Sequence, residues 1–178
     1  MKDILFSSWA GTVVDNRGGS DGSTTHSDTI KKIRMPEKLT ETEPIRAFMG
    51  WDGFVLRSED VHVVDLCRAY MEAVRNQSCG KCIPCQTGTT VMARTLEALC
   101  SGQARPSDIG YLKEVAETVH CTAKCGIGKT GPLPILHALA HFPEQFKNLV
   151  DEKKTIASGN YHASVTAPCM EACPIHLD

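Results

Sequence analysis

Apolar residues recur at intervals of three and four along most of the chain beyond residue 60. The first run predicts an amphipathic helix over about 62–76, and its apolar stripe consists of Val63, Leu66, Cys67, Tyr70 and Val74. Later runs predict helices that begin at Gly88, Pro106, Pro132 and Pro143. Glycines and cysteines interrupt the pattern at 120–131, which predicts a loop there. We therefore expect a mainly α fold, a small helical bundle.

The first fifty residues show no sustained periodicity. Residues 17–25 are rich in Gly, Ser and Thr, which is typical of a flexible, turn-rich stretch. Residues 54–56, Phe-Val-Leu, follow a glycine and predict one short strand. We expect an irregular N-terminal arm over 1–50, a helical domain over 51–152, and a flexible polar linker with the start of a second cysteine-containing segment over 153–178.

Composition and charge exclude several classes of protein. The chain has 178 residues, a net charge of −2 and 42% hydrophobic residues, so we expect no binding to nucleic acid. No apolar run approaches the roughly 20 residues that span a bilayer, and Asp3 interrupts any signal-peptide pattern at the N-terminus. Nine cysteines in such a chain indicate a reducing, cytoplasmic location with thiols reserved for metal.

Three of these cysteines lie close together at C-x-x-C-x-x-C spacing. They are Cys79, Cys82 and Cys85, and Gly80 and Pro84 between them predict a tight loop. Structural zinc sites usually take cysteines in pairs from two places. A third thiolate three residues on suits a [4Fe–4S] cluster better, because each iron at a separate corner takes one thiolate. Zinc remains the alternative, and three buried core cysteines are a weaker one.

A fourth ligand has to come from elsewhere in the chain. Cys125 is the first candidate because two glycines follow it closely and would let the backbone approach an inorganic cluster. Cys121 is the second candidate. Cys67 and Cys100 fall on helical apolar stripes, so we expect both in the core.

Other motifs in the chain are incomplete, and we predict no catalytic residue. The run G-I-G-K-T has Ala123 where a phosphate-binding loop needs glycine, so it predicts no nucleotide site. His137 and His141 lack the glutamate of a zinc-protease helix. Two lysines, Lys81 and Lys124, lie beside the candidate ligands, as do Lys129 and His120. These cationic side chains would either favour the reduced, more negative state of a cluster or serve solubility alone.

Four features of the chain together resemble a known domain. They are the motif S-C-G-K-C-x-P-C-x-x-G-T, the cysteine forty residues later, the run P-L-P and the motif H-F-x-x-x-F. That domain is the C-terminal iron–sulfur domain of the NADH-binding flavoprotein subunit of complex I and of its hydrogenase and formate dehydrogenase relatives. The resemblance covers about 51–150. It implies a helical bundle that binds one [4Fe–4S] cluster through Cys79, Cys82, Cys85 and Cys125. Gln86 departs from the arginine usual in that family.

The tail A-P-C-M-E-A-C-P-I-H-L-D resembles a second family, on about twelve residues. It is similar to the start of the ferredoxin-like N-terminal domain of glutamate synthase small-subunit-like, FAD-dependent oxidoreductases. The resemblance implies that Cys169 and Cys173 bind part of a second iron–sulfur cluster. His162 and Val165 stand where some relatives have two more cysteines, so ligands from a partner or a longer chain would have to complete that site.

These observations predict an electron-transfer module of a flavin- and NAD(P)H-linked oxidoreductase complex. Its partners would be flavoprotein and other iron–sulfur subunits or domains, and the chain itself would be a non-catalytic part of the enzyme. The alternative is a structural metal-binding domain, with zinc or a cluster, that holds such a complex together.

The chain is expected to bind neither NADH nor FMN by itself, because no glycine-rich strand–helix unit precedes residue 50. Isothermal titration calorimetry of the 178-residue chain with each compound measures this. Micromolar binding of either one would show that the interpretation of residues 1–50 is wrong.

Overall fold

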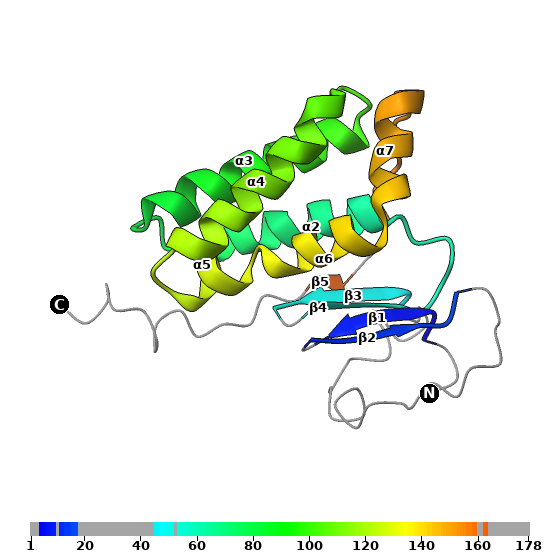
Figure 1. Ribbon diagram of the computed structural model, residues 1–178, viewed down its shortest axis with the longest axis horizontal. Helices are drawn as coiled ribbons and strands as arrows, with labels where there is room; N and C mark the ends of the chain where they lie inside the picture. Colours follow the sequence, from blue (N-terminus) through cyan, green and yellow to red (C-terminus); the bar gives the residue numbers. More distant parts are fainter. Residues whose placement is uncertain (1–3, 10, 18–44, 52, 160–161, 164–178) are drawn as a thin grey trace.

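Helices stack on one face of a small sheet in the computed structural model, which describes residues 4–9, 11–17, 45–51, 53–159 and 162–163 (Figure 1). The strands are β1 Phe6–Trp9, β2 Thr12–Asp15, β3 Ala47–Gly50, β4 Gly53–Leu56 and β5 His162–Ala163. The helices are α2 Val63–Gln77, α3 Ile83–Cys100, α4 Pro106–Thr122, α5 Gly126–Thr130, α6 Leu133–His141 and α7 Pro143–Glu152. The predicted mainly α fold is confirmed, and so is the short strand at 54–56.

The sheet has the order β2-β1-β4-β3-β5, and its pairs are antiparallel except for β3 with β5. Gly53 is the first residue of β4, and it pairs with Gly50 of β3 on one side and with Trp9 of β1 on the other. Gly53 has a φ of +142°, and a Cβ there would lie only 1.7 Å from the carbonyl oxygen of Ser8. Only glycine can occupy this position without moving β1 away from β4.

The prediction of an irregular arm over 1–50 is wrong for the residues of β1, β2 and β3. These strands have four residues each, and every residue of β1 is buried, so no polar–apolar alternation marks it. A short strand covered on both faces lacks the period-two signal on which a sequence-based assignment depends. Residues 18–44, with nearly all of the turn-rich stretch, lie outside the described part of the chain.

Two apolar clusters hold the layers together. The larger one joins the helix-facing side of the sheet to the bundle, and it contains Phe6, which packs 5.4 Å from the Phe54 ring and 4.8 Å from the Phe142 ring. The smaller one lies on the other face of the sheet and includes Trp9 and Val55. The larger cluster therefore attaches the sheet to the helices, because its apolar side chains are buried between the two layers.

The bundle is built from consecutive helices that pack side by side, α2 against α3 and α3 against α4. Its centre holds large side chains with almost no exposed surface: Leu66, Tyr70, Met92, Leu96 and Leu99. Helices α2, α4, α6 and α7 begin within one residue of the predicted positions. In the described part of the chain, no helix combines the length and the apolar character that a membrane crossing requires.

Residues after α7 run back along the bundle. The amide of Ile156 donates to the carbonyl of Cys100 at 2.9 Å, and the amide of Gly159 donates to the buried Asp65 carboxylate at 2.6 Å. Arg68 donates both to Asp65 and, at 2.7 Å, to the hydroxyl of Ser158. Strand β5 follows and pairs with β3. The prediction of a flexible linker is therefore wrong over 155–159, because backbone groups of these polar residues bond to the helices.

Replacing Asp65 with Ala is expected to lower the free energy of unfolding by about 2–4 kcal/mol, because Arg68 and the Gly159 amide lose a buried acceptor. Urea denaturation followed by circular dichroism measures the change. Asp60→Ala is the control, since Asp60 forms only an exposed ion pair with Arg46 and a contact with Ser58. Equal losses for the two variants would contradict the role given to Asp65.

Candidate metal centre

The three clustered cysteines lie where α2 ends and α3 begins. Cys79 is exposed in the connection after Gln77, Cys82 is the N-cap of α3, and Cys85 lies in the first turn of that helix. The predicted helix start at Gly88 is therefore wrong, and so is the prediction of a loop at Cys85. Proline is tolerated in a first turn because its missing N–H has no partner there, so Pro84 starts the helix and does not break it.

Cys125 lies at the N-cap of the short helix α5. The prediction of a loop over 120–131 is wrong at both ends, because α4 continues through Thr122 and α5 occupies Gly126–Thr130. A hydrogen bond from the ring of His120 to the backbone carbonyl of Lys129 joins these two helices. Five residues are too few to show helical periodicity in a sequence.

Helix α5 packs directly against the first turn of α3. A Cβ on Gly128 would lie 3.3 Å from the Cβ of Cys85 and 2.3 Å from the Cβ of Ala123. Gly128 is therefore required for the close approach of the two segments that carry the predicted ligands. Sequence analysis identified this glycine for its closeness to Cys125 but could not show that it faces Cys85.

The four predicted ligands influence one another. Burial raises the pKa of the Cys85 thiol, and the nearby thiolates of Cys125, Cys82 and Cys79 raise this pKa further. Cys82, Cys85 and Cys125 are each no more than 5% exposed. Each would have to lose its proton to bind metal. Coulombic repulsion among buried thiolates is relieved when cationic iron binds them, so the grouping suits a metal centre.

The four cysteines supply as many thiolates as a [4Fe–4S] cluster takes. Among the described residues, no group of three His, Cys, Asp or Glu side chains could hold one metal ion between them. Tetrahedral zinc needs its thiolates about 2.3 Å from one point. A [4Fe–4S] cluster places its irons at separate corners and takes one thiolate at each, so its ligands stand farther apart.

Ser78 is a neighbour of the ligands that sequence analysis missed. Its hydroxyl lies 3.5 Å from the Cys85 sulfur, and hydrogen bonding to this hydroxyl lowers the pKa of the Cys85 thiol, against the effect of burial. The same hydroxyl accepts a hydrogen bond from the amide of Gly80 at 3.4 Å. The only sign of this role in the sequence was the position of Ser78 directly before Cys79. A serine at this position could equally have marked only the end of the preceding helix.

The other described cysteines, Cys67, Cys100 and Cys121, lie outside the proposed ligand set. Cys67 and Cys100 are buried between α2 and α3, which confirms that both belong to the core. Burial raises the pKa of Cys67 well above its usual range and the pKa of Cys100 to about 12, so both stay as neutral thiols. Cys121 is exposed in the last turn of α4. Cys169 and Cys173 lie outside the described residues.

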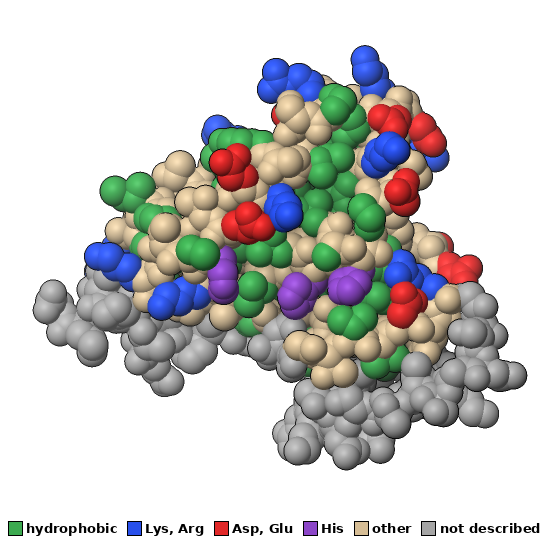
Figure 2. Space-filling view, in the orientation of Figure 1, with side chains coloured by type: hydrophobic (Ala, Val, Ile, Leu, Met, Phe, Trp, Pro, Cys, Tyr) green, Lys and Arg blue, Asp and Glu red, His purple; other side chains and the backbone are tan. Residues whose placement is uncertain are grey.

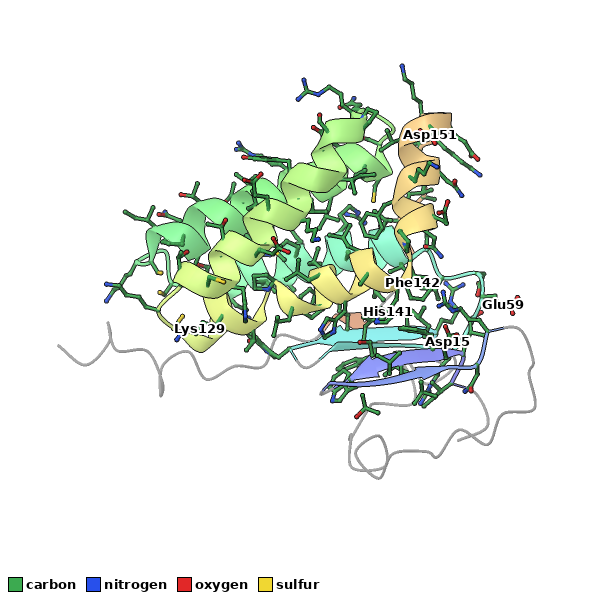
Figure 3. The ribbon with its side chains drawn as sticks, in the orientation of Figure 1. Asp15, Glu59, Lys129, His141, Phe142 and Asp151 are labelled. Atoms are coloured by element: carbon green, nitrogen blue, oxygen red, sulfur yellow. The ribbon has the colours of Figure 1, made fainter. Side chains whose placement is uncertain are left out.

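Positive charge surrounds the candidate centre. The segments 78–96 and 118–143, which carry all four candidate ligands, contain no Asp or Glu. Lys81, Lys124 and Lys129 are exposed there. Lys129 and Asp151 lie at opposite ends of the bundle (Figure 3). Asp151 is a residue of α7. Figure 2 shows Lys and Arg side chains and no Asp or Glu at the Lys129 end on the visible face.

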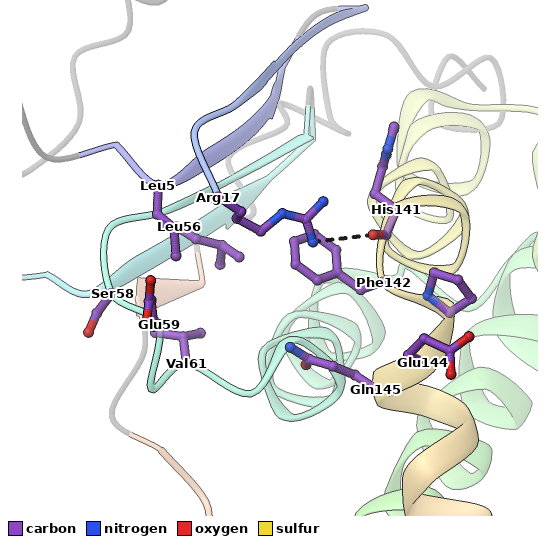
Figure 4. Close-up of a pocket in the computed structure, with 11 residues that line it drawn as sticks. Leu5, Arg17, Leu56, Ser58, Glu59, Val61, His141, Phe142, Glu144 and Gln145 are labelled. Carbon is purple, nitrogen blue, oxygen red and sulfur yellow. Dashed lines mark hydrogen bonds between the residues drawn. The ribbon is translucent and has the colours of Figure 1, made fainter. Parts of the chain in front are cut away.

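A separate cavity of about 330 Å³ lies between the sheet and the α6–α7 junction (Figure 4). Arg17 lies 4.2 Å above the Phe142 ring and donates to the carbonyl of His141 at 3.5 Å. Nearby, the Nδ1 atom of His137 forms a hydrogen bond with the hydroxyl of Ser8 at 3.1 Å. No cysteine lines this cavity, so the two histidines and the four cysteines belong to different parts of the molecule.

Comparison with known proteins identifies the helical part of the chain. Residues 65–149 match the family described as the NADH-ubiquinone oxidoreductase-F iron–sulfur binding region. The matched range contains Cys79, Cys82, Cys85 and Cys125.

Relatives match over all of this chain. One is the NADPH-Fe(3+) oxidoreductase subunit beta of Geobacter sulfurreducens, which is 36% identical over 100% of this chain and 26% of its own length. Another is the NADP(+)-dependent formate dehydrogenase subunit beta of Moorella thermoacetica, which is 29% identical over 100% of this chain and 29% of its own. The chain therefore spans little more than a quarter of these relatives.

A solved structure shares part of the fold. It is an NAD⁺-reducing [NiFe]-hydrogenase in the H2-reduced state, with a TM-score of 0.52 and 26% identity over 55% of this chain and 17% of that one.

Replacing Gly128 with Ala is expected to reduce the iron bound per chain, because the added methyl group would collide with Ala123 and press on Cys85, which would shift α5 against the first turn of α3. Iron and acid-labile sulfide analysis after anaerobic purification measures the loss. Gly110→Ala is the matched control, since a Cβ on this exposed helical glycine meets nothing within 4 Å. Full iron content in Gly128→Ala would show that close packing at this point is unnecessary.

Proposed function

We propose that the chain relays single electrons within an NAD(P)H-linked oxidoreductase complex, because its residues 65–149 match the NADH-ubiquinone oxidoreductase-F iron–sulfur binding region. Cys79, Cys82, Cys85 and Cys125 are the proposed ligands of its [4Fe–4S] cluster. The observation that carries the assignment is the packing of α5 on the first turn of α3, which brings Cys125 to the three clustered cysteines.

A bound [4Fe–4S] cluster supplies one-electron chemistry at a potential that its surroundings adjust. The residues of the chain would supply ligation, exclusion of water and charge. Cys82, Cys85 and Cys125 are buried and would hold the cluster away from solvent, whereas Cys79 is exposed. Cationic side chains nearby favour the more negative, reduced state, so the exposed lysines at this end would raise the potential.

The proposed partners are a flavin-bearing subunit or domain and further iron–sulfur subunits. Support comes from the relatives, several of which are named as subunits of NADPH-, NADP- or NADH-dependent oxidoreductases. Seven of the described cysteines are free thiols, which supports a reducing, cytoplasmic location. The division at about residues 50 and 152 remains a proposal.

A structural role is the second candidate, and the shortness of α5 favours it. A helix of five residues is not stable by itself, so a metal centre linking Cys125 to the start of α3 would hold this part of the bundle together. Such a role is compatible with zinc or with a cluster that carries no current. The two candidates differ in the metal present and in whether the centre accepts an electron.

Cys169 and Cys173 are proposed to contribute to a second iron–sulfur cluster. Support comes from their spacing before a proline and from the resemblance of the tail to a ferredoxin-like domain. Two thiolates do not complete a [4Fe–4S] cluster, which takes four. Cys67 and Cys100 are committed to the core of the bundle. The missing ligands would therefore come from another domain or subunit.

Replacing any one of the four proposed ligands with Ser is expected to remove or convert the cluster, because serine offers no thiolate to iron. The readouts are iron content, sulfide content and the visible absorption spectrum of anaerobically purified protein. Cys121→Ser is the matched control and should keep all three unchanged. If Cys121→Ser loses the cluster and Cys125→Ser does not, the assignment of the fourth ligand is wrong.

The isolated chain is expected to contain about four iron atoms, the number in a single [4Fe–4S] cluster. The double variant Cys169→Ser with Cys173→Ser should contain the same amount, because the pair lacks its other ligands in this chain. About eight irons in the unaltered chain, falling by half in the double variant, would mean that these 178 residues complete a second site.

A further inference from the structure

An apolar groove of about 450 Å³ runs between α3 and α4. Ile83 and Pro84 form one end, and Val91, Tyr111 and Val115 line its length. Its two helices come close together because Gly88 has no side chain; a Cβ there would lie 2.1 Å from a methyl carbon of Val119. The polar surface within the groove is small, so water there has few partners.

The groove begins between two of the proposed ligands, in the first turn of α3. Ile83 and Pro84 are the two residues between Cys82 and Cys85, and the proposed cluster would therefore lie next to this end. Ile83 is 74% exposed although it stands between two buried cysteines. Any protein that covered the groove would come close to the cluster.

Exposed hydrophobic side chains concentrate in this groove. Among the described residues, the large hydrophobic side chains with most exposure are Ile83, Tyr111 at 50% and Val13 at 46%. Two of the three line the groove, and Val13 lies on β2, which contributes nothing to it. Adjacent exposed apolar side chains around a hollow are typical of a protein–protein contact.

The charge around the ligand end of the groove has one sign. Lys81, Lys124 and Lys129 are exposed on the segments that carry the ligands, and these segments lack Asp and Glu. Glu114 is the one carboxylate among the residues that line the groove, and it lies one helical turn from Tyr111, on the side toward the ligand end. A complementary surface would present carboxylates to the lysines.

We propose that the α3–α4 groove is the docking site for an acidic electron-transfer protein or subunit, which inserts an apolar side chain between Ile83 and Tyr111. This proposal rests on the proposed function, since the groove matters because it adjoins the cluster. The lysines alone could be explained as balancing the negative charge of a cluster. That explanation leaves the exposed Ile83 and Tyr111 unaccounted for.

The test uses the complex as purified from cells that produce the full-length protein. A zero-length carbodiimide reagent joins lysine amines to carboxylates that touch them, and mass spectrometry identifies the joined peptides. The expected result is cross-links from Lys81, Lys124 or Lys129 to Asp or Glu of a different subunit. Their yield should fall as salt is raised, because screening weakens contacts between exposed charges.

Tyr111→Glu is expected to lower the yield of these cross-links roughly tenfold or more, as loss of a central aromatic contact does at other interfaces. Val13→Glu is the control, since Val13 has similar exposure on a strand away from the groove. Iron content and the visible spectrum are measured on the same samples and should match the unaltered protein in both variants.

Three results would overturn the proposal: cross-links only to a second copy of this chain, cross-links only to Glu171 or Asp178 of the same chain, or equal losses in Tyr111→Glu and Val13→Glu. Mixing isotopically labelled and unlabelled chains separates the first result from the second. A failure of the proposed function can be told apart from a failure of this docking proposal. It would appear as missing iron in the unaltered protein, whatever the cross-links show.

Discussion

The close contact between α5 and the first turn of α3 is the constraint on which the site depends. A Cβ on Gly128 would lie 3.3 Å from the Cβ of Cys85 there, and this contact joins the segment of Cys125 to a cysteine forty residues earlier in the sequence. Burial raises the pKa of the Cys85 thiol there, and the neighbouring thiolates raise it further. The bundle therefore holds together a set of groups whose repulsion is removed when metal binds.

The rest of the molecule keeps this end of the bundle rigid and accessible. The sheet packs its apolar face on the helices through Phe6, and residues 155–159 bond along α2 and α3 through Asp65 and Arg68. Both features are away from residues 79–85, where Cys79 and Ile83 are exposed. A rigid scaffold with one exposed end is suited to electron exchange, because the ligands stay fixed while a partner approaches.

The helices could be predicted from the sequence because their apolar stripes are long enough to show their period. Strand β1 could not, since a strand of four buried residues has no alternation to read, and β2 has only four residues, of which one is buried. The spacing of Cys79, Cys82 and Cys85 led to the proposed ligand set, but the helical setting of Cys82 and Cys85 could not be predicted from it. Pro84 suggested a break and instead starts α3, while the contact of Gly128 with Cys85 depends on tertiary packing that no local pattern records.

The central claim is that one redox-active [4Fe–4S] cluster is bound by Cys79, Cys82, Cys85 and Cys125. A reductive titration of the anaerobic chain with dithionite, followed by visible absorption and electron paramagnetic resonance, tests it most directly. The account predicts broad visible absorption that bleaches with uptake of about one electron per chain and the appearance of a paramagnetic signal. A colourless protein that contains one zinc and accepts no electron would contradict it.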